Sequence, residues 1–101
     1  MKALEEAFAQ ALAARLDAAA ACGVDQKRLR AQAARYGAVD CARALLGKGR
    51  PSDGFDALAE AGRLELTLEV LAVEDRFAPL FTDAEVNQAL SRLLEAGYQS
   101  W

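Results

Sequence analysis

Four carboxylates stand close together in the second half of the chain, at Glu65, Glu69, Glu74 and Asp75. A pair of carboxylates can perform general acid–base catalysis when a cleft holds both and separates their pKa values. Nothing in this spacing requires such a cleft, so a solvated acidic face is expected instead. Such a face suits a basic partner, either a protein or a channel that normally holds nucleic acid. These four residues are therefore the candidate protein-binding residues.

The residue types that are missing restrict catalysis further. The chain has no histidine, which is the usual acid–base group near neutral pH and the usual partner of serine and cysteine nucleophiles. Its two cysteines, Cys22 and Cys41, cannot complete a tetrahedral zinc site. We expect no catalytic residue, no metal and no cofactor, and we expect that the chain is not an enzyme.

Basic residues concentrate in the middle of the chain, with seven basic against two acidic side chains between Val24 and Arg50. They are Lys27, Arg28, Arg30, Arg35, Arg43, Lys48 and Arg50. Cationic side chains that meet phosphates supply most nonspecific affinity for nucleic acid, so the segment 27–50 is a candidate nucleic-acid-binding region. The alternative is a solvated surface that the acidic half of the domain neutralises. The net charge of −3 favours this alternative.

Two further patterns resemble known binding motifs but lack essential parts. The helices expected on either side of Gly37 could form a helix-turn-helix, but the second offers only Asp40 and Arg43 to base edges. The stretch from Gly47 to Ser52 is glycine-rich and basic. It lacks the P-loop spacing and follows no strand, so it is expected to be a flexible loop.

Apolar periodicity and stop signals predict six helices, some of them very short. The first covers Ala3 to Cys22, with Leu4, Phe8, Leu12 and Leu16 on one face and Gly23 as its stop. Asp25 is expected to cap a second helix over Gln26 to Arg35 whose inner face is Leu29, Ala33 and Tyr36. A third covers Ala38 to Leu46, with Val39, Ala42 and Leu45 or Leu46 inward. Ser52 or Asp53 is expected to cap a fourth, which carries Phe55, Leu58 and Ala59 and ends at Gly62.

The stretch from Leu64 to Val70 alternates strictly between apolar and polar residues, which by itself predicts a half-buried strand. No second strand candidate exists to pair with it, and an isolated strand would leave its backbone groups unsatisfied. Leu64, Leu68 and Leu71 also fit one helical stripe, and Leu66, Val70 and Val73 fit a second. This stretch is therefore expected to be the fifth helix. The sixth begins at a capping box formed by Thr82 and Glu85. Its inner face is Val86, Leu90, Leu93 and Leu94.

A longer pattern of caps, stops and apolar residues runs from Tyr36 to Tyr98. It reads YGAV..A..LL from Tyr36, S.GF..L from Ser52, GRL.LT.E from Gly62, F..LFT..E from Phe77, Leu93, and GY at Gly97. On these residues the chain resembles a family of small uncharacterised bacterial proteins. The resemblance implies a helical fold but no activity. Ala59 departs from the pattern, because similar proteins often have tryptophan there, and the first two helices match only loosely.

These observations predict an all-α bundle of about six short helices in a single domain, residues 1–101. The expected function is a non-catalytic protein-interaction module whose partner is another protein or protein complex. One possible setting is a phage or mobile-element inhibitor of a bacterial defence complex. The alternative is an accessory nucleic-acid-binding protein. With no leader and no long apolar run, the chain is expected to be cytoplasmic, with no membrane partner and reduced thiols. The sequence leaves its oligomeric state open.

Overall fold

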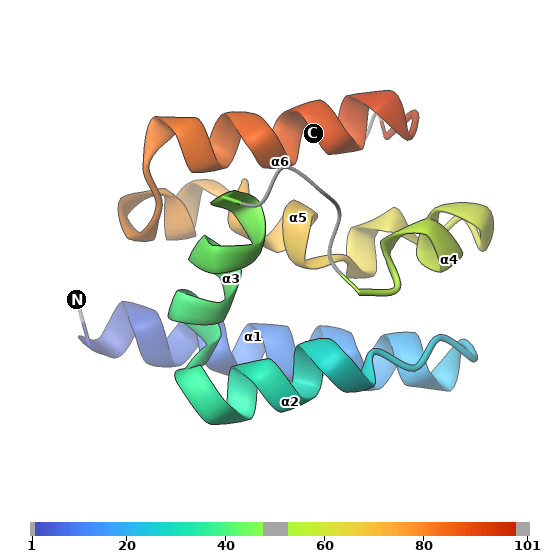
Figure 1. The fold of residues 1–101 in the computed structure, drawn as a ribbon, viewed down its shortest axis with the longest axis horizontal. Coiled ribbons are helices and arrows are strands. Elements are labelled where there is room, and N and C mark those ends of the chain that lie inside the picture. Colours follow the sequence, from blue (N-terminus) through green and yellow to red (C-terminus); the bar gives the residue numbers. More distant parts are fainter. Residues whose placement is uncertain (1, 48–52, 99–101) are drawn as a thin grey trace.

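The computed structural model describes residues 2–47 and 53–98, and every regular element in these ranges is helical (Figure 1). The α-helices are α1 (Lys2–Ala21), α2 (Lys27–Tyr36), α3 (Ala38–Gly47), α4 (Phe55–Glu60), α5 (Leu68–Ala72) and α6 (Asp83–Glu95). Two 3-10 helices, η1 (Leu64–Leu66) and η2 (Asp75–Leu80), flank α5. The predicted all-α fold is therefore confirmed.

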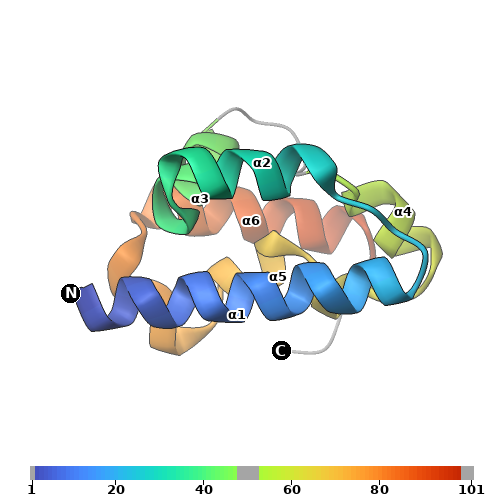
Figure 2. The same cartoon turned by 90° about the horizontal axis from the view of Figure 1, so that it is seen from below.

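The helices are arranged in layers. Helices α1 and α2 lie together on one side of the molecule, α6 lies on the opposite side, and α4 and α5 lie between them (Figures 1 and 2). Helix α3 crosses from the α1–α2 layer to α6. The core fills the space that these elements enclose, because the α1 stripe faces inward: Phe8, Leu12 and Leu16 are buried.

Aromatic rings join α1 to the segment around η2. The ring of Phe8 meets Phe77 edge-on with a centroid distance of 5.1 Å, and it meets Phe81 in a similar geometry at 5.4 Å. Pairs of this geometry add stabilisation beyond the burial of their area. They fix η2, and the carboxylates at its start, relative to α1.

The alternating stretch after Arg63 is helical, as predicted, but it is divided in two. Leu64–Leu66 forms η1, Thr67 is extended, and α5 begins at Leu68. The Thr67 hydroxyl accepts a hydrogen bond from the Val70 amide at 3.2 Å and donates one to the Leu64 carbonyl at 2.8 Å. All of its apolar residues, Leu64, Leu66, Leu68 and Val70, are buried, because this segment lies between the other helices of the bundle.

The predicted helix cap is present where both capping residues lie within one helical turn. The predicted capping box of α6 is present: Thr82 Oγ1 accepts from the Glu85 amide at 3.2 Å, and Glu85 Oε1 accepts from the Thr82 amide at 2.8 Å. The prediction for α2 was wrong. Asp25 makes no cap, and the Arg28 amide instead donates to Asp53 Oδ2 at 3.1 Å.

The Asp53 carboxylate therefore caps α2, and among the described residues no side chain caps α4. The residue at the N-cap position of α4 is Gly54, whose φ of 79° lies in the left-handed region. A Cβ at Gly54 would lie 2.8 Å from Cγ of Gln26, and the Gln26 side chain is itself buried and donates to the Asp53 carbonyl at 2.8 Å. This close contact joins the start of α4 to the start of α2. Ser52, the other expected cap, lies outside the described residues.

Two residues that were predicted to lie in the core are exposed to solvent instead. Leu94 is 63% exposed and Tyr36 is 58% exposed. The inner face of α6 centres on Ala89, Arg92 and Leu93, which leaves Leu94 on its edge. Tyr36 ends α2, directly before Gly37 reverses the chain with a φ of 90°.

Candidate interaction surfaces

Three of the four predicted carboxylates lie around one hollow of about 560 Å³, here called the acidic hollow. Glu65 comes from η1, while Glu74 and Asp75 stand at the start of η2. The floor is apolar and consists of Leu66, Val70 and Val73, and Arg15 of α1 and Tyr98 complete the lining. The arrangement combines an apolar floor with a charged rim, which is the usual anatomy of a protein-binding surface.

Arginines neutralise two of these carboxylates. Glu74 accepts from Arg15 Nη2 at 2.7 Å and from Arg76 Nε at 2.9 Å. Arg15 also donates to the Glu65 carbonyl. Glu65 in turn accepts from Arg63 Nε at 2.7 Å. The hydrogen bond from Arg63, followed by one from the Glu65 backbone amide, holds the pKa of the Glu65 carboxyl below its ordinary value.

Asp75 differs from its two neighbours. It is exposed, and it forms no ion pair with any described residue. Its charge is therefore the one at this rim that a partner can meet without displacing an arginine of the protein itself.

The structure corrects the expectation for Glu69. This carboxylate was expected on the solvated acidic face, but its side chain has no exposed surface. Glu69 Oε2 accepts from Arg92 Nη1 of α6 at 3.3 Å. Helix α5 is enclosed by the bundle, so Glu69 is not accessible to a partner.

Arg92 is a structural residue that the sequence reasoning missed. Its Nη2 donates to the Leu45 carbonyl at 3.1 Å and to the Leu46 carbonyl at 3.3 Å, and so satisfies acceptors at the C-terminal end of α3. A signal was present in the sequence, because Arg92 falls between Ala89 and Leu93 within the apolar stripe of α6. A cation at such a position requires a buried anionic partner.

The predicted basic residues divide into separate groups. Lys27, Arg28, Arg30 and Arg35 are exposed side chains of α2. Arg43 is separate, because its Nε and Nη2 donate to the Leu80 carbonyl at 2.9 and 2.7 Å and tie α3 to the end of η2. Lys48 and Arg50 lie outside the described residues, as does most of the expected loop from Gly47 to Ser52.

Acidic residues neutralise part of the α2 surface. Arg30 Nη2 lies 3.1 Å from Asp17 Oδ1, and Lys27 Nζ lies 3.9 Å from Asp25 Oδ2. Arg28 and Arg35 form no ion pair with any described residue. The Arg35 guanidinium instead lies 5.2 Å from the ring centroid of Tyr36.

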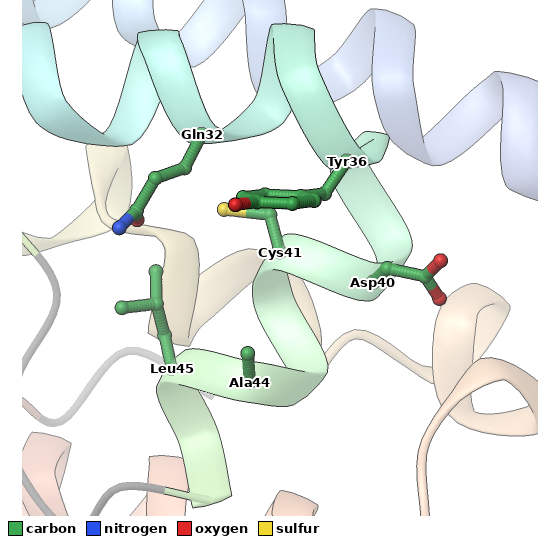
Figure 3. A pocket seen from close by; sticks show the side chains of 6 residues that line it. All are labelled: Gln32, Tyr36, Asp40, Cys41, Ala44 and Leu45. Atoms are coloured by element: carbon green, nitrogen blue, oxygen red, sulfur yellow. The ribbon is translucent and has the colours of Figure 1, made fainter.

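A second hollow of about 410 Å³ lies between α2 and α3 (Figure 3). Its lining consists of Gln32, Tyr36, Asp40, Cys41, Ala44 and Leu45. Sequence reasoning missed this hollow, because Tyr36 was expected in the core.

Cys41 is buried while Cys22 is exposed, and neither is in a disulfide.

Within residues 2–47 and 53–98, no three histidine, cysteine, aspartate or glutamate side chains gather closely enough to hold a metal ion. None of the helices described there is both long enough and apolar enough to cross a membrane.

In comparisons with protein-family models, with curated proteins and with solved structures, nothing matches this chain. The resemblance seen in its sequence therefore stays a prediction.

Proposed function

We propose that the protein is a non-catalytic protein-interaction module and that the acidic hollow holds a segment of its partner. The observation that carries this proposal is the convergence of Glu65, Glu74 and Asp75 around one apolar floor. Glu65 comes from η1 and Asp75 from η2, which lie on either side of α5 in sequence, and Glu74 directly precedes η2. An apolar floor with a charged rim gives a partner both buried area and a fixed orientation.

The lining defines the chemistry of the partner segment. Leu66, Val70 and Val73 suit one large apolar side chain, since burial of such a side chain contributes about 1.5–3 kcal/mol. Asp75 suits a lysine or arginine beside that anchor. The partner segment is therefore basic and apolar together.

A random peptide library tests this chemistry without knowledge of the natural partner. The immobilised protein is used to select peptides, and each enriched peptide is then measured against two charge-reversed variants. Asp75→Lys changes the rim of the hollow. Asp56→Lys is the matched control, because Asp56 is an exposed aspartate on α4, outside the lining of the hollow. Glu69 stays unchanged in every variant, because its reversal would place an unpaired charge in the core.

We expect enrichment of peptides that carry an apolar residue next to lysine or arginine. Asp75→Lys should weaken their binding by about tenfold or more, since an attractive contact becomes repulsive, and Asp56→Lys should leave it unchanged. A circular dichroism spectrum confirms that both variants stay helical. Enrichment of acidic peptides, or equal binding by both variants, would contradict the proposal.

A second candidate function rests on α2. Arg28 and Arg35 lie two turns apart, about 10 Å along the helix, and both are exposed without a described carboxylate partner. Such a pair can contact phosphates of nucleic acid. If this is the function, the unmodified protein binds a generic duplex near physiological salt. Arg28→Glu with Arg35→Glu should abolish that binding, while Asp75→Lys should not.

A further inference from the structure

The hollow between α2 and α3, here called the α2–α3 hollow, presents an aromatic ring to solvent. Its volume of about 410 Å³ falls within the usual range for sites that hold small organic groups. Tyr36 lines it and is 58% exposed, so its ring offers surface to a ligand. Gln32 of α2 and Leu45 of α3 point toward each other across the hollow (Figure 3), and Ala44 adds to its apolar side. The hollow therefore suits a flat organic group with a polar edge.

Cations flank the hollow on its α2 side. Arg28 precedes Gln32 by four residues, and Arg35 follows Gln32 by three. Residues at these spacings are neighbours on the surface of a helix. Both arginines are exposed, and neither forms an ion pair with any described residue. Two positive charges without a described carboxylate partner therefore lie beside the hollow, one on each side of Gln32.

The acidic groups near this surface leave both positive charges in place. Asp40, the acidic residue of the lining, lies 3.7 Å from Arg43 Nη1. Asp53 accepts a hydrogen bond from the backbone amide of Arg28 and forms an ion pair with neither guanidinium. The Arg35 guanidinium lies 5.2 Å from the centroid of the Tyr36 ring, in a cation–π contact that does not neutralise it. An anionic ligand is therefore favoured here.

We propose that the α2–α3 hollow binds single-stranded nucleic acid, with one base stacked on Tyr36 and the neighbouring phosphates on Arg28 and Arg35. Proteins hold single strands in this way, because every base has a face that stacks on an aromatic ring and cations follow the backbone. The Gln32 amide both donates and accepts hydrogen bonds, so it suits the edge of any base. The site should accordingly have little sequence preference.

This proposal goes beyond the second candidate function, which requires only phosphate contacts from α2. A duplex keeps its bases paired and stacked, so it cannot place a base on Tyr36 without opening. The acidic hollow has no part in the proposal, because none of its lining residues lines the α2–α3 hollow.

Fluorescence anisotropy with two labelled strands of about 12 nucleotides, within the site size of single-strand-binding folds, tests the proposal. One strand is oligothymidine, and the other has the same sugar–phosphate backbone without bases. Both offer the same phosphates, so the ratio of their dissociation constants measures the contribution of the bases. We expect the unmodified protein to bind oligothymidine about tenfold or more tightly, the effect of one stacked base. Binding of both strands should weaken as salt rises.

Three variants assign these effects to residues. Tyr36→Ala should remove the preference for the strand with bases, whereas Tyr36→Phe should keep it. Arg28→Glu with Arg35→Glu should weaken the binding of both strands. Leu94→Ala is the matched control, because Leu94 is the other large apolar residue that is exposed among the described residues and it lies on α6. It should leave both dissociation constants unchanged, and circular dichroism verifies that every variant is folded.

Several outcomes would overturn the proposal. They are equal affinity for the two strands, and binding of oligothymidine that Tyr36→Ala leaves unchanged. Tighter binding of the corresponding duplex would assign the arginines to phosphate contacts alone, and selection of peptides that depends on Tyr36, without binding of oligothymidine, would assign the hollow to a protein. An oligouridine strand of the same length distinguishes RNA from DNA as the preferred single strand. Asp75→Lys should not change the binding of either strand, so failure here is distinguishable from failure of the acidic hollow as a peptide site.

Discussion

At the scale of single residues, Arg92 holds three helices together. It extends from α6, pairs with Glu69 of α5, and donates to two carbonyls at the end of α3. A buried ion pair contributes little net stability compared with apolar residues of the same size, but the loss of one partner leaves the other charge uncompensated. The pair therefore acts mainly by fixing which helices meet.

Arg92→Met should lower the free energy of unfolding by about 3–5 kcal/mol, because it removes the guanidinium from the buried ion pair with Glu69 and from the carbonyls at the end of α3. The double variant Arg92→Met with Glu69→Leu should recover part of this loss. Arg76→Met serves as the control, since Arg76 pairs with Glu74 at the surface and should cost at most about 1 kcal/mol. Denaturant titration measures all three, and equal losses for Arg92→Met and Arg76→Met would refute this account.

At the scale of elements, α2 depends on a cap from outside its own segment. Asp53 follows α3 in sequence, yet its carboxylate accepts from the Arg28 amide in the first turn of α2. The buried Gln26 side chain holds the Asp53 backbone in place. By contrast, the capping box of α6 uses two residues only three positions apart.

Asp53→Ala should therefore destabilise α2 by about 0.5–2 kcal/mol, the usual cost of a lost cap. Asp25→Ala should have little effect, although Asp25 directly precedes the helix, because its only recorded contact among the described residues is a surface pair with Lys27. Hydrogen exchange at the amides of residues 28–30 reports the difference locally. Faster exchange in Asp25→Ala than in Asp53→Ala would reject this assignment of the cap.

At the scale of the whole molecule, packing gives two chemically identical thiols different exposure to solvent. Cys22 is exposed next to the end of α1, and Arg63 Nη1 lies 3.4 Å from its sulfur. Cys41 lies in α3 and is only 3% exposed. Both thiols were expected to be reduced, and of the two only Cys41 is buried in the core.

Alkylation of the native protein should accordingly modify Cys22 at once and Cys41 only as the fold opens. Cys41 reports on opening because a reagent reaches a buried thiol when the surrounding helices separate. Peptide mass spectrometry after increasing labelling times in denaturant measures both rates. Equal rates in native buffer would mean that α3 is not held as described, whereas two modified thiols after complete unfolding would confirm that no disulfide exists.

The sequence by itself determined most of the segments that become helices and where several of them stop, although η2 was not predicted. The α1 stripe of Phe8, Leu12 and Leu16 and the Thr82–Glu85 capping box were both predictable, because periodicity and capping act within one or two helical turns. The helical character of the stretch after Arg63 was also predictable, although the extended Thr67 within it was not.

Only the tertiary structure decided which side of each helix became surface and which distant residues met. It moved Glu69 from the expected acidic face into the core, turned Leu94 and Tyr36 outward, and gave α2 a cap from Asp53. It also brought Glu65, Glu74 and Asp75 together around one apolar floor. These outcomes depend on how separate helices pack, and a contact between residues many turns apart leaves no periodic signal in the chain.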